Sequence, residues 1–139
     1  MPGHEFVGVV EKSNERELVG KRVVGEIDVG CGECSFCRKG LERHCPRRTV
    51  LGIKERNGAF AEFLTLPEKN LHVVPDEVPD VAAVFTEPVA AAYEVLEQTH
   101  VDSSWRLAVV EDGRLGSFIA QVISTLAPEL IIVGQTNPR

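Results

Sequence analysis

The sequence predicts a mixed α/β fold in two parts: a mostly β first half that carries a zinc lobe, then a single βαβ unit. Three observations lead to this prediction. All four cysteines of the 139-residue chain fall between positions 31 and 45. Short runs of β-branched residues, separated by glycine and charged residues, fill the first half. After Pro79 the apolar residues take helical spacing, and we place the boundary between residues 86 and 87.

The first half is expected to contain four short strands. They fall at residues 6–10, 21–27, 61–66 and 71–74, where apolar and β-branched residues alternate with polar ones or lie between turn residues. Pro75 ends the last of them. This half therefore reads as a small β domain interrupted by the cysteine-rich segment.

The cysteines follow the pattern Cys-x2-Cys-x2-Cys-x7-Cys within a lobe that spans residues 30–48. Glycines at positions 30, 32 and 40 permit the tight bends that aim four sulfurs at one point. Four thiolates around a tetrahedral ion form a closed structural zinc site, which stabilises a loop too poor in apolar side chains to fold alone. The predicted zinc ligands are Cys31, Cys34, Cys37 and Cys45.

Other interpretations of the cysteines remain open at this stage. Two disulfides are disfavoured by a reducing compartment and by the strain of such close pairings. An iron–sulfur cluster is suggested by Pro46 directly after Cys45, but the last gap is too long for the ferredoxin pattern. His44 could replace Cys45 as a ligand. Five basic residues beside the cysteines also keep a basic zinc module in view: Arg38, Lys39, Arg43, Arg47 and Arg48.

The second half is expected to begin with a helix and to continue as strand, turn, helix and strand. From Glu87 onward, apolar residues recur at i, i+3, i+4 and i+7. Strands at 107–110 and 130–133 flank a second apolar helical stripe at 115–126. The turn between them places backbone N–H groups at a helix N-terminus, where a dinucleotide pyrophosphate binds. Of the three positions of G-x-G-x-x-G, Glu111 occupies the first, and Gly113 and Gly116 the others.

Composition excludes some classes of function. The chain has 43% hydrophobic residues, a net charge of -6 and a pI near 5.2, so we expect no general binding to nucleic acid or anionic membranes. No apolar stretch is long enough to span a bilayer, and the first ten residues lack the features of a signal peptide. The sequence therefore predicts a cytoplasmic protein.

Four motifs occur in the order and at about the spacing of one known family. They are Gly3-His4-Glu5, the four-cysteine lobe, Glu87-Pro88-Val89-Ala90 and the VVEDGRLGSFIAQV turn. With them the chain resembles the zinc-containing medium-chain dehydrogenases/reductases, which include alcohol, polyol and threonine dehydrogenases. The resemblance covers essentially the whole chain, but only a middle section of a family member. It implies a partial GroES-like catalytic domain at 1–86, then a connecting helix and the start of a Rossmann nucleotide-binding domain at 87–139.

The resemblance also implies chemistry. His4, Glu5 and Glu87 would hold a second, catalytic zinc, and the enzyme would transfer hydride from an alcohol or polyol to NAD or NADP. A homo-oligomer is compatible with the family. The cofactor-binding residues implied are Gly113, Arg114, Leu115, Gly116, Gly134 and Thr136.

The end of the second strand of the βαβ unit bears on cofactor choice. NAD-specific domains place an acidic residue there, about 20 residues past the glycine-rich turn, but residues 133–137 contain none. A small residue followed by polar ones leaves room for a 2′-phosphate, with Thr136, Asn137 or Arg139 as donors, and favours NADP. Glu111, an anion near the pyrophosphate, disfavours any dinucleotide.

Two departures from the family predict a truncated chain without activity of its own. The family's catalytic zinc has a cysteine ligand upstream of Gly-His-Glu, whereas only three residues precede His4. The nucleotide domain also ends after two strands. The alternative function is a non-catalytic, zinc-stabilised binding or structural fragment.

Overall fold

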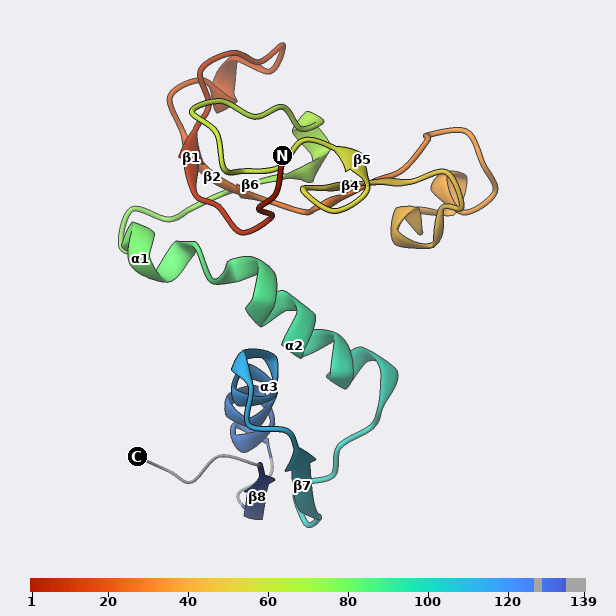
Figure 1. The fold of residues 1–139 in the computed structure, drawn as a ribbon, viewed down its shortest axis with the longest axis vertical. Coiled ribbons are helices and arrows are strands. Elements are labelled where there is room, and N and C mark those ends of the chain that lie inside the picture. Colours follow the sequence, from red (N-terminus) through yellow and green to blue (C-terminus); the bar gives the residue numbers. More distant parts are fainter. Residues whose placement is uncertain (127–128, 135–139) are drawn as a thin grey trace. The chain divides into compact units, whose positions relative to one another are not determined.

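The computed structural model describes residues 1–126 and 129–134 and divides the chain into two compact units, Met1–Glu87 and Pro88–Arg139 (Figure 1). Each unit is described by itself. Among the described residues, no helix combines the length and the apolar character needed to cross a membrane.

The first unit is built on a three-stranded antiparallel sheet. Its strand order is β1 (Gly8–Val9), β2 (Arg22–Gly25) and β6 (Leu71–Val73), and Val23 of β2 faces Val73 of β6. These strands lie inside the predicted segments 6–10, 21–27 and 71–74, which confirms the three predictions with shorter bounds. Two short 3-10 helices, η1 (Arg16–Leu18) and η4 (Glu68–Asn70), lie in the connections.

The core of this unit lies between the sheet and the short helix α1 (Asp80–Ala83). Val24, Val74 and Ala83 are buried together, and Val7 and Val78 pack against them. Arg22 fixes the approach to α1, since its guanidinium pairs with Asp80 at 2.6 Å and donates to the carbonyls of Pro75 and Val78. The sequence prediction did not include α1, because one helical turn is too short to show a periodic pattern.

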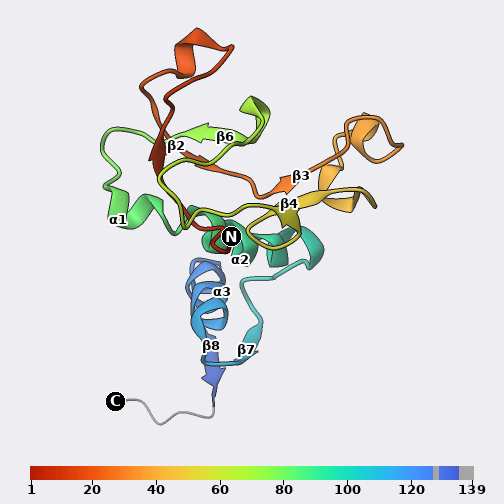
Figure 2. The same ribbon diagram turned by 45° about the horizontal axis from the view of Figure 1, so that its top comes forward.

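A second small sheet carries the cysteine lobe. Strand β3 (Asp28–Val29) pairs antiparallel with β4 (Thr49–Leu51), and β4 pairs parallel with β5 (Glu55–Arg56). The lobe is the excursion between β3 and β4, with 3-10 helices η2 (Cys37–Lys39) and η3 (Glu42–His44) (Figure 2). Strands of two or three residues carry too little alternation to be predicted from sequence.

The predicted strand at 61–66 is wrong. Residues 61 and 62 form a bend, and residues 63–66 have no regular secondary structure. A strand requires a neighbouring strand for its backbone hydrogen bonds, and none of the described strands pairs with this segment. The side chain of Phe63 is 72% exposed, so the apolar alternation here does not mark a buried face.

The second unit contains the predicted βαβ arrangement. Strand β7 (Arg106–Val110) leads through a turn into α3 (Arg114–Ser124), and β8 (Glu129–Val133) returns parallel to β7. Helix α3 contacts both strands. Before them, helix α2 (Thr86–Gln98) begins at the end of the first unit. These elements confirm the predicted helices and strands of this half to within two residues at most ends.

Candidate metal centres and nucleotide-binding turn

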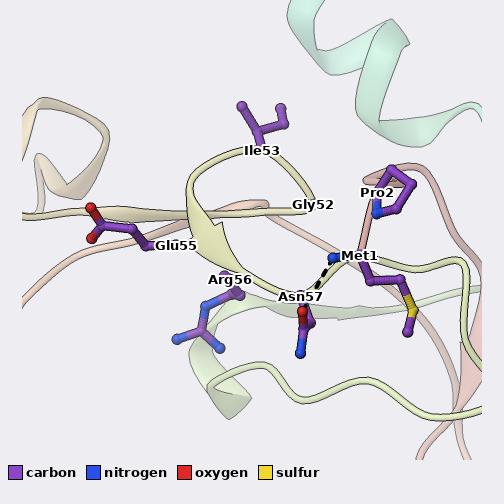
Figure 3. A pocket seen from close by; sticks show the side chains of 7 residues that line it. All are labelled: Met1, Pro2, Gly52, Ile53, Glu55, Arg56 and Asn57. Atoms are coloured by element: carbon purple, nitrogen blue, oxygen red, sulfur yellow. Dashed lines mark hydrogen bonds between the residues drawn. The ribbon is translucent and has the colours of Figure 1, made fainter.

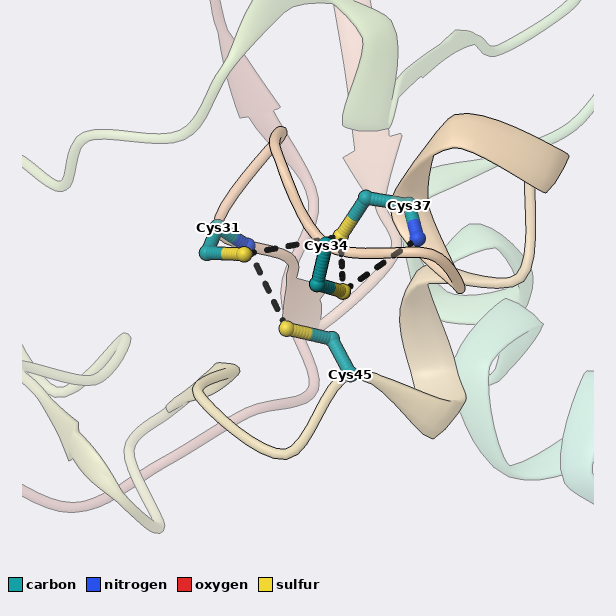
Figure 4. A group of neighbouring side chains, drawn as sticks. All are labelled: Cys31, Cys34, Cys37 and Cys45. Carbon is teal, nitrogen blue, oxygen red and sulfur yellow. Dashed lines mark hydrogen bonds between the residues drawn. The ribbon is translucent and has the colours of Figure 1, made fainter.

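The four cysteine side chains of the lobe point toward a common centre (Figure 4). Their sulfurs all lie within 4.8 Å of one another, with Cys34 and Cys37 3.5 Å apart and Cys31 and Cys37 3.9 Å apart. All four are free cysteines, and bonded sulfurs would lie about 2.05 Å apart. The disulfide interpretation therefore does not describe this structure.

The spacing of the sulfurs fits a single tetrahedral zinc ion. Zinc–sulfur bonds of about 2.3 Å at the tetrahedral angle separate sulfurs by about 3.8 Å, close to the separations found here. Cys37 and Cys45 are buried, and Cys31 and Cys34 are half-buried. With four protein ligands and no open position, such a site is structural.

The backbone of the lobe already favours thiolates at two positions. Hydrogen bonding from the backbone of Glu33 is the main cause that lowers the pKa of Cys31 to about 6, and the backbone of Cys37 lowers the pKa of Cys34. Burial instead raises the pKa of Cys37 to about 11. The Cys37 thiol therefore requires a bound cation to be ionised at neutral pH, and a zinc ion would provide it.

Several of the basic residues near the lobe have acceptors within it or at its base. Arg47 donates to the sulfur of Cys31 at 3.4 Å and pairs with Glu33 at 2.8 Å. Arg48 pairs with Asp28 at 2.8 Å. From the sequence, Arg47 was singled out only as one of five basic residues beside the cysteines, and its contact with a sulfur was not predicted. His44 is exposed, packs near the ring of Phe36, and is outside the described ligand cluster.

His4, Glu5 and Glu87 form a second cluster, within the first unit. The Nε2 atom of His4 lies 4.0 Å from a carboxylate oxygen of Glu5 and 3.9 Å from one of Glu87. One ligand atom from each residue lies within 4.8 Å of the others, and the three side chains are 20–35% exposed. The structure thus brings together residues that are more than 80 positions apart in the sequence.

This cluster has room for a metal ion. Two zinc bonds of about 2.1 Å at the tetrahedral angle separate their ligand atoms by about 3.4 Å. Nε2 of His4 lies 4.0 and 3.9 Å from the carboxylate oxygens of Glu5 and Glu87, so a bound ion would draw the three side chains slightly inward. One imidazole nitrogen and two carboxylate oxygens leave a fourth tetrahedral position open, as in catalytic zinc sites.

The segment that carries His4 is held by hydrogen bonds to the loop after β5. The amides of Gly58, Ala59 and Phe60 donate to the carbonyls of Met1, Gly3 and Pro2 at 2.8, 2.8 and 3.1 Å. The approach is so close that a Cβ on Gly58 or Gly52 would lie 2.2 or 2.1 Å from the carbonyl oxygen of Gly3. These two glycines were not singled out from sequence, because only the folded loop shows what approaches them.

Glu87 is positioned by the first turn of α2. Thr86 donates its hydroxyl to the carbonyl of Ala83 at 2.7 Å, and Pro88 lies in the first turn, where a missing N–H does no harm. A carboxylate in the first turn is favoured by the helix dipole. The half-buried Glu87 is thereby fixed beside His4.

The turn between β7 and α3 has the backbone expected of a dinucleotide site at two of its three glycine positions. Gly113 directly precedes the helix and offers no side chain there. Gly116 is buried, and a Cβ on it would lie 2.7 Å from the carbonyl oxygen of Glu111, so only glycine allows this helix–strand approach. Arg114 and Leu115 occupy the first helical turn, whose N–H groups have no intrahelical acceptors.

Glu111 differs from the glycine expected at the first position. Its carboxylate folds over the turn, with Oε1 2.6 Å from the point that a Cβ on Gly113 would occupy. Because Glu111 is exposed, its carboxylate can turn toward solvent without disturbing buried side chains. Gly134 follows β8 directly, whereas Thr136, Asn137 and Arg139 lie outside the described residues.

An open pocket of about 450 Å³ has none of the cluster residues in its lining. Figure 3 shows that it is lined by Met1, Pro2, Gly52, Ile53, Glu55, Arg56 and Asn57. None of the seven belongs to a predicted site, and the lining offers one carboxylate and one guanidinium without a metal-ligand set. We assign it no function.

Comparison with known proteins identifies the class that this fold and these clusters define. Residues 1–76 match the alcohol dehydrogenase GroES-like domain, and the chain belongs to the zinc-containing medium-chain dehydrogenase/reductase family. Among curated relatives, the sorbitol dehydrogenase of Halalkalibacterium halodurans and the L-threonine 3-dehydrogenase of Xanthomonas euvesicatoria are each 32% identical over 97% of the chain. The chain spans 40% of the length of either relative.

Solved structures show the same fold. An alcohol dehydrogenase from Escherichia coli CFT073 complexed with NADH has a TM-score of 0.85 and 31% identity over 94% of this chain and 40% of its own. A zinc-binding dehydrogenase from Sinorhizobium meliloti 1021 bound to NADP has a TM-score of 0.86 and 26% identity over 95% of this chain and 40% of its own. The predicted fold class and family are therefore confirmed.

Proposed function

We propose that this chain supplies the zinc sites and the first cofactor contacts of a dehydrogenase that oxidises an alcohol or polyol with NAD or NADP. Residues 1–86 act as part of the catalytic domain, and residues 87–139 connect to and begin the nucleotide-binding domain. The observation that carries the proposal is the convergence of His4, Glu5 and Glu87, whose ligand atoms all lie within 4.8 Å of one another. Relatives named sorbitol and threonine dehydrogenases, and neighbours solved with NADH and NADP, support the substrate and cofactor classes.

In the proposed catalytic site, His4 offers an imidazole nitrogen and the two glutamates offer oxygens. A zinc ion bound there supplies Lewis-acid polarisation of the substrate oxygen. The hydrogen bonds of the loop after β5 hold His4, and the first turn of α2 holds Glu87, so the ligands are oriented before an ion arrives. The two carboxylates also offset the charge of the ion in a half-buried site.

The cysteine lobe has a separate, structural role in this proposal. Its four sulfurs close the coordination sphere, so no position remains for substrate. The turn before α3 would contribute the cofactor contacts, because backbone N–H groups of the segment from Gly113 to Gly116 lie at the positive end of the helix dipole and would bind a pyrophosphate. Gly134, at the end of β8, holds the sequence position that would bind the adenosine ribose.

Metal binding tests the proposal on the 139-residue chain. We expect one tightly held zinc in the lobe and a second, weaker metal site, because the second cluster has only three protein ligands and no thiolate. His4→Ala should abolish the weaker site and leave the tight one. The measurement is zinc titration with elemental analysis, repeated with cobalt so that the two coordination spheres are resolved by absorption.

A matched control is His72→Ala. His72 is also paired with a glutamate, Glu26, at 3.0 Å, but it is exposed to solvent and lies outside the described ligand clusters. This variant should keep both sites. Equal metal content in the unaltered chain and His4→Ala, with only the lobe occupied, would reject the catalytic site and favour a non-catalytic, zinc-stabilised fragment.

A further inference from the structure

The structure places a carboxylate at the end of β8, where the sequence shows none. Asp112 belongs to the turn after β7, yet its side chain lies against Gly134, the first residue after β8. A Cβ on Gly134 would lie 2.3 Å from Cγ and 2.4 Å from Oδ2 of Asp112. The Asp112 carboxylate thus fills the space in which a side chain at position 134 would begin.

This space matters for cofactor choice. In dinucleotide-binding domains the acidic residue that binds the ribose 2′-OH follows the second strand, about 20 residues after the glycine-rich turn. Gly134 has that place in the sequence but has no side chain. We propose that Asp112 supplies the missing carboxylate from the neighbouring turn and that the cofactor site thereby selects NAD over NADP. The inference rests on the dinucleotide site of the proposed function.

Charge and geometry give the direction of the selection. A carboxylate accepts hydrogen bonds from the ribose hydroxyls of NAD. In NADP the 2′-oxygen carries a phosphate. This phosphate would lie next to the Asp112 carboxylate, and the two negative charges would repel each other. The absence of acidic residues from the strand end favours NADP by sequence alone, whereas the folded turn reverses this expectation.

Gly134 is needed for this position of Asp112. Any larger residue would require Asp112 to move, since separations of 2.3–2.4 Å are shorter than real Cβ contacts. Gly134 therefore makes room for the side chain of Asp112. A small residue at this position does not by itself indicate a site for the 2′-phosphate of NADP.

The test compares NAD and NADP binding to the 139-residue chain by calorimetry and by NMR of backbone amides. We expect NAD to bind about tenfold more tightly than NADP. In Asp112→Asn the ratio should fall to about one, through tighter NADP binding and weaker NAD binding. Gly134→Ser, which leaves the charge unchanged but displaces Asp112, should reduce the ratio in the same direction.

Glu111→Gln is the matched control, because it removes one negative charge from the same turn. It should tighten both nucleotides and keep their ratio. Preference for NADP in the unaltered chain, or an unchanged ratio in Asp112→Asn, would overturn the inference and leave dinucleotide binding standing. Binding of neither nucleotide, with native-like amide spectra, would overturn the proposed function itself and the inference with it.

Discussion

At the residue scale, the cysteine lobe leaves no space for a side chain at Gly30. A Cβ on Gly30 would lie 2.8 Å from the sulfur of Cys37 and 2.7 Å from Cγ of Glu42. The first of these contacts involves a buried proposed ligand, which has little freedom to move. Glycine at position 30 is therefore required by packing of the lobe rather than by a left-handed backbone.

Gly30→Ala should weaken zinc binding by the lobe about tenfold, because overpacking of about 1–3 kcal/mol falls directly on the metal site. The measurement is competition for zinc with a coloured chelator. Gly8→Ala serves as the control, since a Cβ there meets nothing closer than the ring of Phe6 at 3.9 Å. Equal affinities in the two variants would contradict the packing argument.

At the scale of elements, the lobe and the sheet that carries it differ in what stabilises them. Between Val29 and Thr49 the only buried side chains are those of Cys37 and Cys45 among the described residues. The base of the lobe is tied by the side-chain amide of Asn70, which is buried and donates to the carbonyls of Glu26 and Asp28 at 3.1 and 2.8 Å. The lobe therefore depends on its metal, and the neighbouring strands do not.

Removal of zinc with a chelator should unfold residues 30–48 and leave the sheet of β1, β2 and β6 intact. Hydrogen exchange followed by mass spectrometry should show loss of protection in the lobe alone, since the valine core persists without metal. Adding zinc back should restore protection. Loss of protection in β2 at the same chelator concentration would show that the lobe and sheet unfold together.

At the scale of the whole molecule, the second unit leaves much apolar surface in contact with solvent. Val110 is 78% exposed, and Ile131, Ile132 and Val133 of β8 are 48–60% exposed. Strands of a parallel sheet normally have both faces covered. The 139-residue chain is therefore expected to self-associate through this sheet.

Ile131→Lys should weaken that self-association about tenfold, because covering the exposed part of Ile131 contributes about 1.5 kcal/mol, which corresponds to a factor of about ten. The measurement is the weight-average mass at rising protein concentration, by sedimentation. Val81→Lys is the control: Val81 is 78% exposed but lies on α1, outside the β7–β8 sheet. An unaltered chain that stays monomeric at all concentrations would contradict the expectation.

Features that arise from local order along the chain could be predicted from the sequence. The spacing of the cysteines indicated the zinc lobe. The period of the apolar residues, together with the turn residues, indicated α2, β7, α3 and β8. Each of these signals lies within one short segment of the chain. The sequence failed at residues 61–66, where alternation suggested a strand, since pairing depends on a distant partner that local pattern does not reveal.

Contacts between distant residues depend on how the chain folds. It brought Glu87 to His4, set the loop of Gly58 against Gly3, and placed Asp112 on Gly134. Each of these contacts joins segments that are separated by many residues. Its geometry depends on close packing, in which one added methyl group is enough to displace a neighbour. Local propensity and spacing contain no information about such distances, so these contacts are properties of the folded chain.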